Sequence, residues 1–256
     1  MVCAIGIGVW FFWEGSQEVA INELVWQEKI APPQQVLEKN IENDNPTPIE
    51  GNIENTLIAD KFIQLDVPFI LQAPFANWSD FVFENACEEA SIAMAMNWIA
   101  GEGSVSPEKA KKQILEIVKF EDKEFGYNTD TDIFDMQIIF QKYFKYQNIE
   151  TQKNISIQDI KTELQKGNVV IVPAFGRALK NPNYTGLGPI VHMLIIIGYD
   201  PKTKEFITND PGTRKGAGYR YAENVLFSAI WLYPSGPDTP TVPTGALKKG
   251  MLIVRK

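Results

Sequence analysis

The chain has 256 residues, 45% of them hydrophobic, and a formal net charge of −8 at pH 7. This length can bury a full core and favours one domain with extensions, while the acidic balance argues against nucleic acid or an anionic lipid surface as the main partner. The only histidine is His192, which excludes a metal site built from several histidines, and the two cysteines do not suggest a disulfide framework. We expect no metal, no cofactor and a monomer.

The first 13 residues, MVCAIGIGVWFFW, form an uncharged and strongly apolar run. They are too few for a straight helix across a bilayer, which needs about 20 residues. No basic residues precede the run and no small-residue cleavage site follows it, but its tryptophans would suit a membrane interface. We interpret residues 1–13 as the remaining end of a membrane anchor, which would place the protein outside the cytoplasm. A hydrophobic strand or helix docked on the domain is the alternative.

Polar, proline-containing stretches flank the compact part of the chain. Residues 14–60 carry too little apolar surface for a core and are interpreted as a tether. The compact domain is expected over residues 61–234, and it opens with a strand over 62–70 that Pro68 interrupts. Residues 235–256 are expected to be a proline- and threonine-rich linker and a tail, in which 251–254 either adds a late edge strand or lies outside the domain.

The first predicted helix begins at Cys87, after a run of loop-forming residues over 72–85. Apolar residues at positions 92, 95, 96 and 99 recur at helical spacing, which indicates a buried helix. Free N–H groups and the helix dipole at such a start favour a thiolate, as a cysteine nucleophile requires. A small, buried, unreactive cysteine is the alternative on residue type alone.

Three further helices are expected before residue 168. Ser106, followed by a proline, caps the first of them, which runs to about residue 120. Thr131 is expected to cap the next, with apolar residues at 133, 136, 140 and 144. The acids around Thr131 indicate a helix start rather than a cation site, because calcium-loop spacing is absent. Ser156 and Asp159 resemble a capping box, and Gly167 ends that helix.

Strands follow the helices. Residues 169–172, 193–199 and 205–209 are short and mostly apolar, and the last two form a β-hairpin around residues 200–204. Residues 219–233 are expected to hold a final helix. Helices first and antiparallel strands second predict an α+β fold.

The hairpin brings His192 and Asp210 to the same end of the sheet, because one precedes its strand and the other follows the partner strand. If Tyr199 pairs with Glu205, Asp210 falls on the face of His192, whereas an even-numbered loop places Asn209 there instead. Either side chain could hold the imidazole and fix its tautomer, as the third member of a catalytic triad does. An ordinary turn over residues 209–212 is the alternative.

Four segments together resemble a known family: VPFILQ, ACEEAS, HMLIIIGYD and ITNDPG. Over about residues 62–233 the chain is similar to the papain-like cysteine peptidases related to the bacteriocin-leader (double-glycine) peptidases, and more narrowly to their stand-alone bacterial branch. The resemblance implies a papain-like fold and cleavage of peptide or amide bonds in a peptide or protein substrate.

The resemblance also implies roles for single residues. Cys87 would be the nucleophile, His192 the general base and then the acid, and Asp210 the orienting residue. Gln72 would help to form the oxyanion hole, although from the sequence alone it could equally satisfy backbone groups in a loop. Independently of the resemblance, the long glycine-rich loop over 175–191 is expected to form a wall of the substrate cleft, and a plain surface loop is the alternative. Substrate contacts are assigned to three residues: Tyr184, Gly188 and Trp78.

The chain departs from the family at the nucleophile, where Glu88 and Glu89 replace the common Gly-Pro or Gly-Ala. A carboxylate facing the thiol raises its pKa, but neighbouring helical side chains diverge, so the expected effect is modest. Two alternatives to a hydrolase therefore stay open. One is a weak or inactive peptide-binding module of the same fold, and the other is acyl transfer to an amine instead of water.

Overall fold

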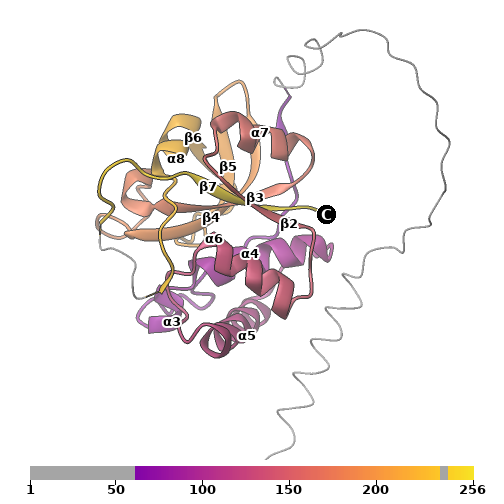
Figure 1. The fold of residues 1–256 in the computed structure, drawn as a ribbon, viewed down its shortest axis with the longest axis vertical. Coiled ribbons are helices and arrows are strands. Elements are labelled where there is room, and N and C mark those ends of the chain that lie inside the picture. Colours follow the sequence, from indigo (N-terminus) through magenta and orange to yellow (C-terminus); the bar gives the residue numbers. More distant parts are fainter. Residues whose placement is uncertain (1–60, 237–241) are drawn as a thin grey trace, which may run out of the picture. The chain divides into compact units, whose positions relative to one another are not determined.

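The computed structural model describes residues 61–236 and 242–256 of the chain (Figure 1). The predicted anchor over 1–13 and the predicted tether over 14–60 lie outside the described residues. Among the helices of the described part, none has the length and apolarity that crossing a bilayer requires.

The core of the domain is one antiparallel sheet. Its strands are β1 (Ile63–Gln64), β2 (Ile149–Lys153), β3 (Val169–Phe175), β4 (Val191–Asp200), β5 (Glu205–Asn209), β6 (Tyr219–Ala222) and β7 (Gly250–Val254). They lie in the order β2-β7-β3-β4-β5-β6, and the short β1 pairs with β4 beyond the residues that β3 occupies. The middle strands β3 and β4 are mostly apolar because both of their faces are covered, and His192 is a buried exception in β4.

Helices cover the sheet on both sides (Figure 1). They are α3 (Phe81–Glu84), α4 (Cys87–Ile99), α5 (Pro107–Glu124), α6 (Ile133–Ile138) with the π-helical turn η1 (Ile139–Tyr143), α7 (Ile157–Gln165), the 3₁₀ turn η2 (Gly176–Leu179) and α8 (Glu223–Ala229). Helix α4 packs against β4 and is buried over nearly its whole length. Helices α7 and α8 contribute Ile160, Leu164 and Leu226 to a cluster with residues of β3 and β4. The predicted α+β class is therefore confirmed.

Most predicted helix starts are confirmed in detail. The Ser106 side chain accepts a hydrogen bond from the Lys109 N–H, with proline in the first turn of α5. Ser156 and Asp159 form the full capping box of α7. The prediction that Thr131 is a cap is wrong, because the Asp132 carboxylate accepts from the Phe134 and Asp135 N–H groups in the first turn of α6, and Thr131 is buried.

Three strand assignments needed correction. Residues 250–254 are neither an edge strand nor outside the domain, because β7 pairs with both β2 and β3 inside the sheet. Residues 219–222, expected to be helical, form β6, and α8 begins only at Glu223. Strand β2 was not predicted, since IETQK is largely polar and its pattern suits a strand near a sheet edge.

The β4–β5 hairpin contains an irregularity that determines which residues face the site. At the loop, Asp200 pairs with Glu205 and Tyr199 with Phe206, so the connecting loop over 201–204 has an even number of residues. The register then shifts by one between Ile196 and Gly198, as a β-bulge does, and Ile195 pairs with Asn209.

Candidate active site

Cys87 is the first residue of α4 and is 6% exposed. The preceding residue, Ala86, makes no side-chain cap. The first N–H groups of the helix, at the end where Cys87 lies, therefore have no side-chain oxygen as a cap. Helix α3 directly precedes this start and is itself capped by Asp80. The predicted placement of Cys87 at a buried helix N-terminus is thus confirmed.

His192 and Asp210 form the central contact of the site. The His192 Nε2 lies 2.8 Å from the Asp210 Oδ1, and both side chains are buried. The Gly212 N–H donates to the same carboxylate oxygen at 3.0 Å. Because Nε2 is engaged by Asp210, Nδ1 is the ring nitrogen that is left for a second partner.

The β-bulge explains why Asp210 rather than Asn209 meets the imidazole. The even loop by itself would have placed Asn209 on the face of His192, but the shift after Ile196 moves Asp210 opposite Leu194 and so onto that face. Asn209 instead donates to the Val67 carbonyl and accepts from the Gly218 N–H. Asp210 therefore holds the His192 ring, and Asn209 connects the segment of Val67 to the loop that contains Gly218.

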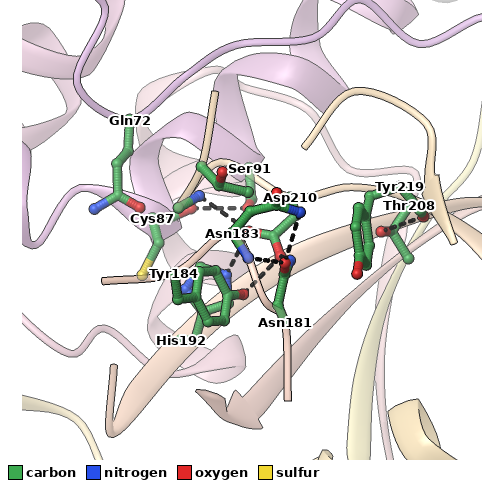
Figure 2. Close-up of polar contacts among 12 residues, drawn as sticks. Gln72, Cys87, Ser91, Asn181, Asn183, Tyr184, His192, Thr208, Asp210 and Tyr219 are labelled. Carbon is green, nitrogen blue, oxygen red and sulfur yellow. Dashed lines mark hydrogen bonds and ion pairs between the residues drawn. The ribbon is translucent and has the colours of Figure 1, made fainter. Parts of the chain in front are cut away.

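A set of donors converges on the other carboxylate oxygen of Asp210 (Figure 2). The Tyr184 and Tyr221 hydroxyls each donate to Oδ2 at 2.6 Å, and the Asn181 amide lies 3.3 Å from it. Burial opposes ionisation of Asp210, but the charge of His192 and these hydrogen bonds outweigh it and lower the pKa of the carboxyl. Asp210 is therefore held as a carboxylate in a buried setting.

Tyr184, which was expected to contact the substrate, also contacts both His192 and Asp210. Its ring stands edge-on to the His192 ring, with centroids 5.5 Å apart, and its hydroxyl is used by Asp210. Burial and the nearby Asp210 charge raise the pKa of the Tyr184 hydroxyl well above its ordinary value, so it stays a donor. Tyr184 joins the wall of the cleft to the His192–Asp210 pair.

Cys87 and His192 open onto one cleft with a volume of about 1160 Å³. Gln72, Trp78, Tyr184 and Gly188 line the same cleft, so the structure brings together every residue expected there except the buried Asp210, which lies behind His192. Gly188 has a positive φ of 81°, and a Cβ there would lie 2.8 Å from the Tyr184 ring. Its missing side chain lets Tyr184 pack against the backbone.

Gln72 lies beside Cys87 in Figure 2 and is 4% exposed. Its amide Nε2 donates to the backbone carbonyls of Phe83 and Glu84, and its own N–H donates to the Pro211 carbonyl. These bonds connect the start of the domain to α3 and to the loop after Asp210. Within the described residues the Gln72 Oε1 has no hydrogen-bond partner.

The thiol of Cys87 makes an unexpected contact. Its Sγ donates to the Glu88 Oε2 at 2.9 Å, and the backbone of Met193, next to His192, hydrogen bonds the sulfur. Burial, the Glu88 charge and its hydrogen bond raise the pKa of the Cys87 thiol well above the ordinary value, against the Met193 contact. The expectation that Glu88 diverges from the thiol with a modest effect is wrong, because the glutamate side chain turns back to the sulfur.

Glu88 belongs to a group of buried acids behind the nucleophile. Its Oε1 accepts from the Tyr233 hydroxyl at 2.7 Å, and burial raises the pKa of its carboxyl to about 7. Glu89 faces Glu121 of α5, whose Oε1 accepts from Thr131. Burial also raises the pKa of Glu121 to about 7. Adjacent carboxyls out of water share protons instead of ionising together.

The sequence prediction did not include two residues of this site. Tyr221 and Asn181 contact Asp210 and each other, with 2.7 Å between the Asn181 amide and the Tyr221 hydroxyl. Tyr221 was placed in a helix, which hid the strand that aims it at the site. The signal for Asn181 was its position in the long loop before His192.

No described residues group three or more acidic, cysteine or histidine side chains in a way that could hold a metal ion. The arrangement offers a thiol, an imidazole hydrogen-bonded to a carboxylate, and a cleft of about 1160 Å³ onto which the thiol and the imidazole open. A thiol nucleophile with an oriented imidazole as its base is the set of groups that covalent acyl transfer uses.

A family model, described as the Peptidase_C39 like family, matches residues 64–236. The chain belongs to this family of C39-like peptidases. A crystal structure from Bacillus anthracis, provisionally described as a C39-like peptidase, is similar at 13% identity and a TM-score of 0.44, over 77% of this chain and 99% of that chain. Comparison with curated proteins gives no match.

Family membership and the described architecture agree on the fold. The chain has the α+β, papain-like fold of C39-like peptidases, with the cysteine-bearing helix α4 packed on the sheet that carries His192. The family indicates peptidase function, and hence peptide or protein substrates.

Proposed function

We propose that this protein is a cysteine peptidase that cleaves peptide or amide bonds through a thioester acyl-enzyme. One observation supports this most directly: His192, held at 2.8 Å by Asp210, lines the same cleft as Cys87. An imidazole oriented by a carboxylate near a thiol at a helix start is the arrangement that thiol hydrolysis requires.

In the proposed mechanism the imidazole acts as base and then as acid. The S–H bond of Cys87 breaks, the proton passes to the His192 Nδ1, and the electron pair left on sulfur attacks the substrate carbonyl carbon. The imidazolium then protonates the leaving amine as the C–N bond breaks, and water hydrolyses the remaining thioester. Asp210 keeps its negative charge throughout and stabilises the imidazolium.

The developing oxyanion needs donors. The Cys87 backbone N–H, in the first turn of α4, is one candidate, and the Gln72 amide beside it is the other. Because the Gln72 amide already donates to the Phe83 and Glu84 carbonyls, its proposed role requires a shift or a shared hydrogen bond when substrate is present.

A peptide would lie in a cleft lined by charges of both signs. The lining includes the basic residues Arg177, Arg214 and Lys215 and the acidic residues Glu84 and Asp130. Trp78 and Gly188 are the proposed substrate contacts, and Tyr184 lies where the cleft meets the His192–Asp210 pair.

The proposal also includes the oligomeric state and the location of the protein. The protein would be a monomer, and residues 1–13 would hold it at a membrane outside the cytoplasm.

Cleavage of a peptide mixture, followed by mass spectrometry of the products, tests this function. Wild-type protein should produce new termini, Cys87→Ala should produce none, and a thioester adduct should be trapped on Cys87 when the reaction is quenched with acid. Products that also arise with Cys87→Ala would contradict a cysteine mechanism. Added amines separate hydrolysis from transfer, since only transfer joins them to the acyl fragment.

A catalytically weak peptide-binding module is the second candidate. The raised pKa of the Cys87 thiol, caused by burial and Glu88, favours it. Peptides retained equally by wild type and Cys87→Ala, with no cleavage by wild type after long incubation, would support this alternative.

A further inference from the structure

Glu88 contacts the proposed nucleophile directly and is fixed in place by its own partner. The thiol of Cys87 donates to its Oε2 at 2.9 Å, and Tyr233 donates to its Oε1 at 2.7 Å. Glu88 is 2% exposed, so water neither competes for the carboxylate nor screens its charge. A thiol that donates to this carboxylate is held in its protonated form.

Several titratable groups surround this carboxyl. On its own helix they are Cys87 and Glu89; from α5 comes Glu121, from the loop before α6 comes Asp130, and after α8 comes Tyr233. All are acidic or neutral, so the carboxyl has no cationic partner among them. His192 of β4 is the chain neighbour of Met193, whose backbone hydrogen bonds the Cys87 sulfur.

We infer that Glu88 is a positioning residue that holds the Cys87 thiol protonated and turned away from His192 in the resting protein, so that the nucleophile forms only when this hydrogen bond is given up. The inference rests on the proposed cysteine chemistry and specifies how it is regulated. Glu88 acts through Cys87 and does not touch the substrate.

Two routes release the thiol, and both conserve protons and charge. In the first, substrate entry turns the sulfur toward His192, the S–H bond breaks, the proton goes to Nδ1, and Glu88 stays ionised. In the second, solvent protonates Glu88 at mildly acidic pH. The neutral carboxyl no longer attracts the thiol proton or repels the thiolate, so transfer to His192 becomes easier.

The test compares the pH dependence of Cys87 alkylation by iodoacetamide in wild type, Glu88→Gln and Glu89→Gln. In Glu88→Gln the amide oxygen can accept from Tyr233 while its N–H₂ group faces the sulfur and donates to a thiolate. We expect alkylation at pH 7 to rise about tenfold and its inflection to move to lower pH, since one pKa unit changes the thiolate fraction tenfold. Glu89→Gln is the matched control, because it makes the same change at a neighbouring buried carboxyl that makes no hydrogen bond to the thiol.

A Glu88→Gln profile that coincides with wild type, or an equal shift in Glu89→Gln, would overturn the inference. If Glu88→Gln does not fold by circular dichroism, infrared spectroscopy of the wild type decides. The S–H stretching band should lie at the frequency of a thiol bonded to a carboxylate, and it should move when Glu88 is protonated. A band at the frequency of a free thiol at every pH would overturn the inference as well.

The outcome is distinguishable from failure of the proposed function. Alkylation reports the state of the sulfur whether or not any peptide is cleaved. If Glu88→Gln accelerates alkylation while adding His192→Ala to that variant leaves the faster rate unchanged, Glu88 holds the thiol as inferred, but the cysteine–histidine mechanism fails.

Discussion

His192 and Asp210 are joined by a 2.8 Å hydrogen bond although the loop of their hairpin has the parity that should separate them. The β-bulge after Ile196 removes one residue from the register and turns Asp210 onto the imidazole face. The bulge therefore determines the geometry of the candidate site, since without it Asn209 would face His192.

Asp210→Asn should reduce peptidase activity by on the order of 100-fold or more. An asparagine can offer its oxygen either to the His192 Nε2 or to the two tyrosine hydroxyls, but not to both. If the oxygen faces the tyrosines, the amide N–H₂ group faces Nε2 and imposes the wrong tautomer. Steady-state kinetics on a cleaved peptide measure the loss, and activity within a few-fold of wild type would contradict the orienting role.

Tyr184→Phe and Tyr221→Phe each remove one 2.6 Å donor from the Asp210 Oδ2. Each should lower kcat roughly tenfold and shift the acidic limb of the pH profile upward, because the hydrogen bonds from Tyr184 and Tyr221 help to lower the pKa of Asp210. Only Tyr184→Phe should also change KM, since only Tyr184 lines the cleft. Identical effects on KM from both variants would show that Tyr184 has no contact with substrate.

Gly212→Ala should impair the site without unfolding the domain. A Cβ at this position would lie 2.8 Å from the His192 Cε1 and 3.3 Å from the Asp210 Oδ1, which displaces the ring from its carboxylate. Gly103→Ala is the matched control, because nothing lies within 4 Å of its Cβ position. The pair is compared by kcat and by melting temperature. Equal activity in the two variants would contradict close packing around His192.

Glu121→Gln should raise the melting temperature at pH 8 and leave it nearly unchanged at pH 4. Burial raises the pKa of this carboxyl from 4.5 to about 7, so the folded state binds its proton more tightly than the unfolded chain does. Stability is therefore lost as pH rises through 4.5 to 7, by on the order of 1–3 kcal/mol above that window. Calorimetry across this pH range checks the result, and an equal effect at both pH values would point to packing instead.

Local patterns predicted the helix at Cys87 and the capping box of Ser156, because capping and helical spacing are short-range effects. The bulge was harder to predict, but Gly198 carried a signal. A glycine inside a strand often marks a bulge or a close backbone approach, and a Cβ there would lie 2.2 Å from the Ile63 carbonyl of β1.

Long-range contacts could not be predicted from the sequence. Tyr233 reaches Glu88 across 145 residues of chain, and this contact fixes the carboxylate that turns back to the thiol. Adjacent positions on a helix suggested that the two side chains diverge, but a glutamate has enough rotatable bonds to reach its neighbour once burial removes the competing water. Residues 251–254 were expected to form an edge strand or to lie outside the domain. The place of β7 inside the sheet was missed because its partners, β2 and β3, are far from it in sequence.

The rate of Cys87 alkylation by iodoacetamide, measured from pH 4 to 9 in Glu88→Gln and in the double variant Glu88→Gln/His192→Ala, tests the central claim most directly, because without the Glu88 carboxylate the thiol is free to meet His192. If Cys87 passes its proton to His192, alkylation near neutral pH should be at least tenfold faster in the single variant than in the double variant, and the double variant should show only the late rise of a buried thiol. Superimposable profiles would mean that the sulfur and the imidazole do not act together, and the proposed mechanism would be wrong.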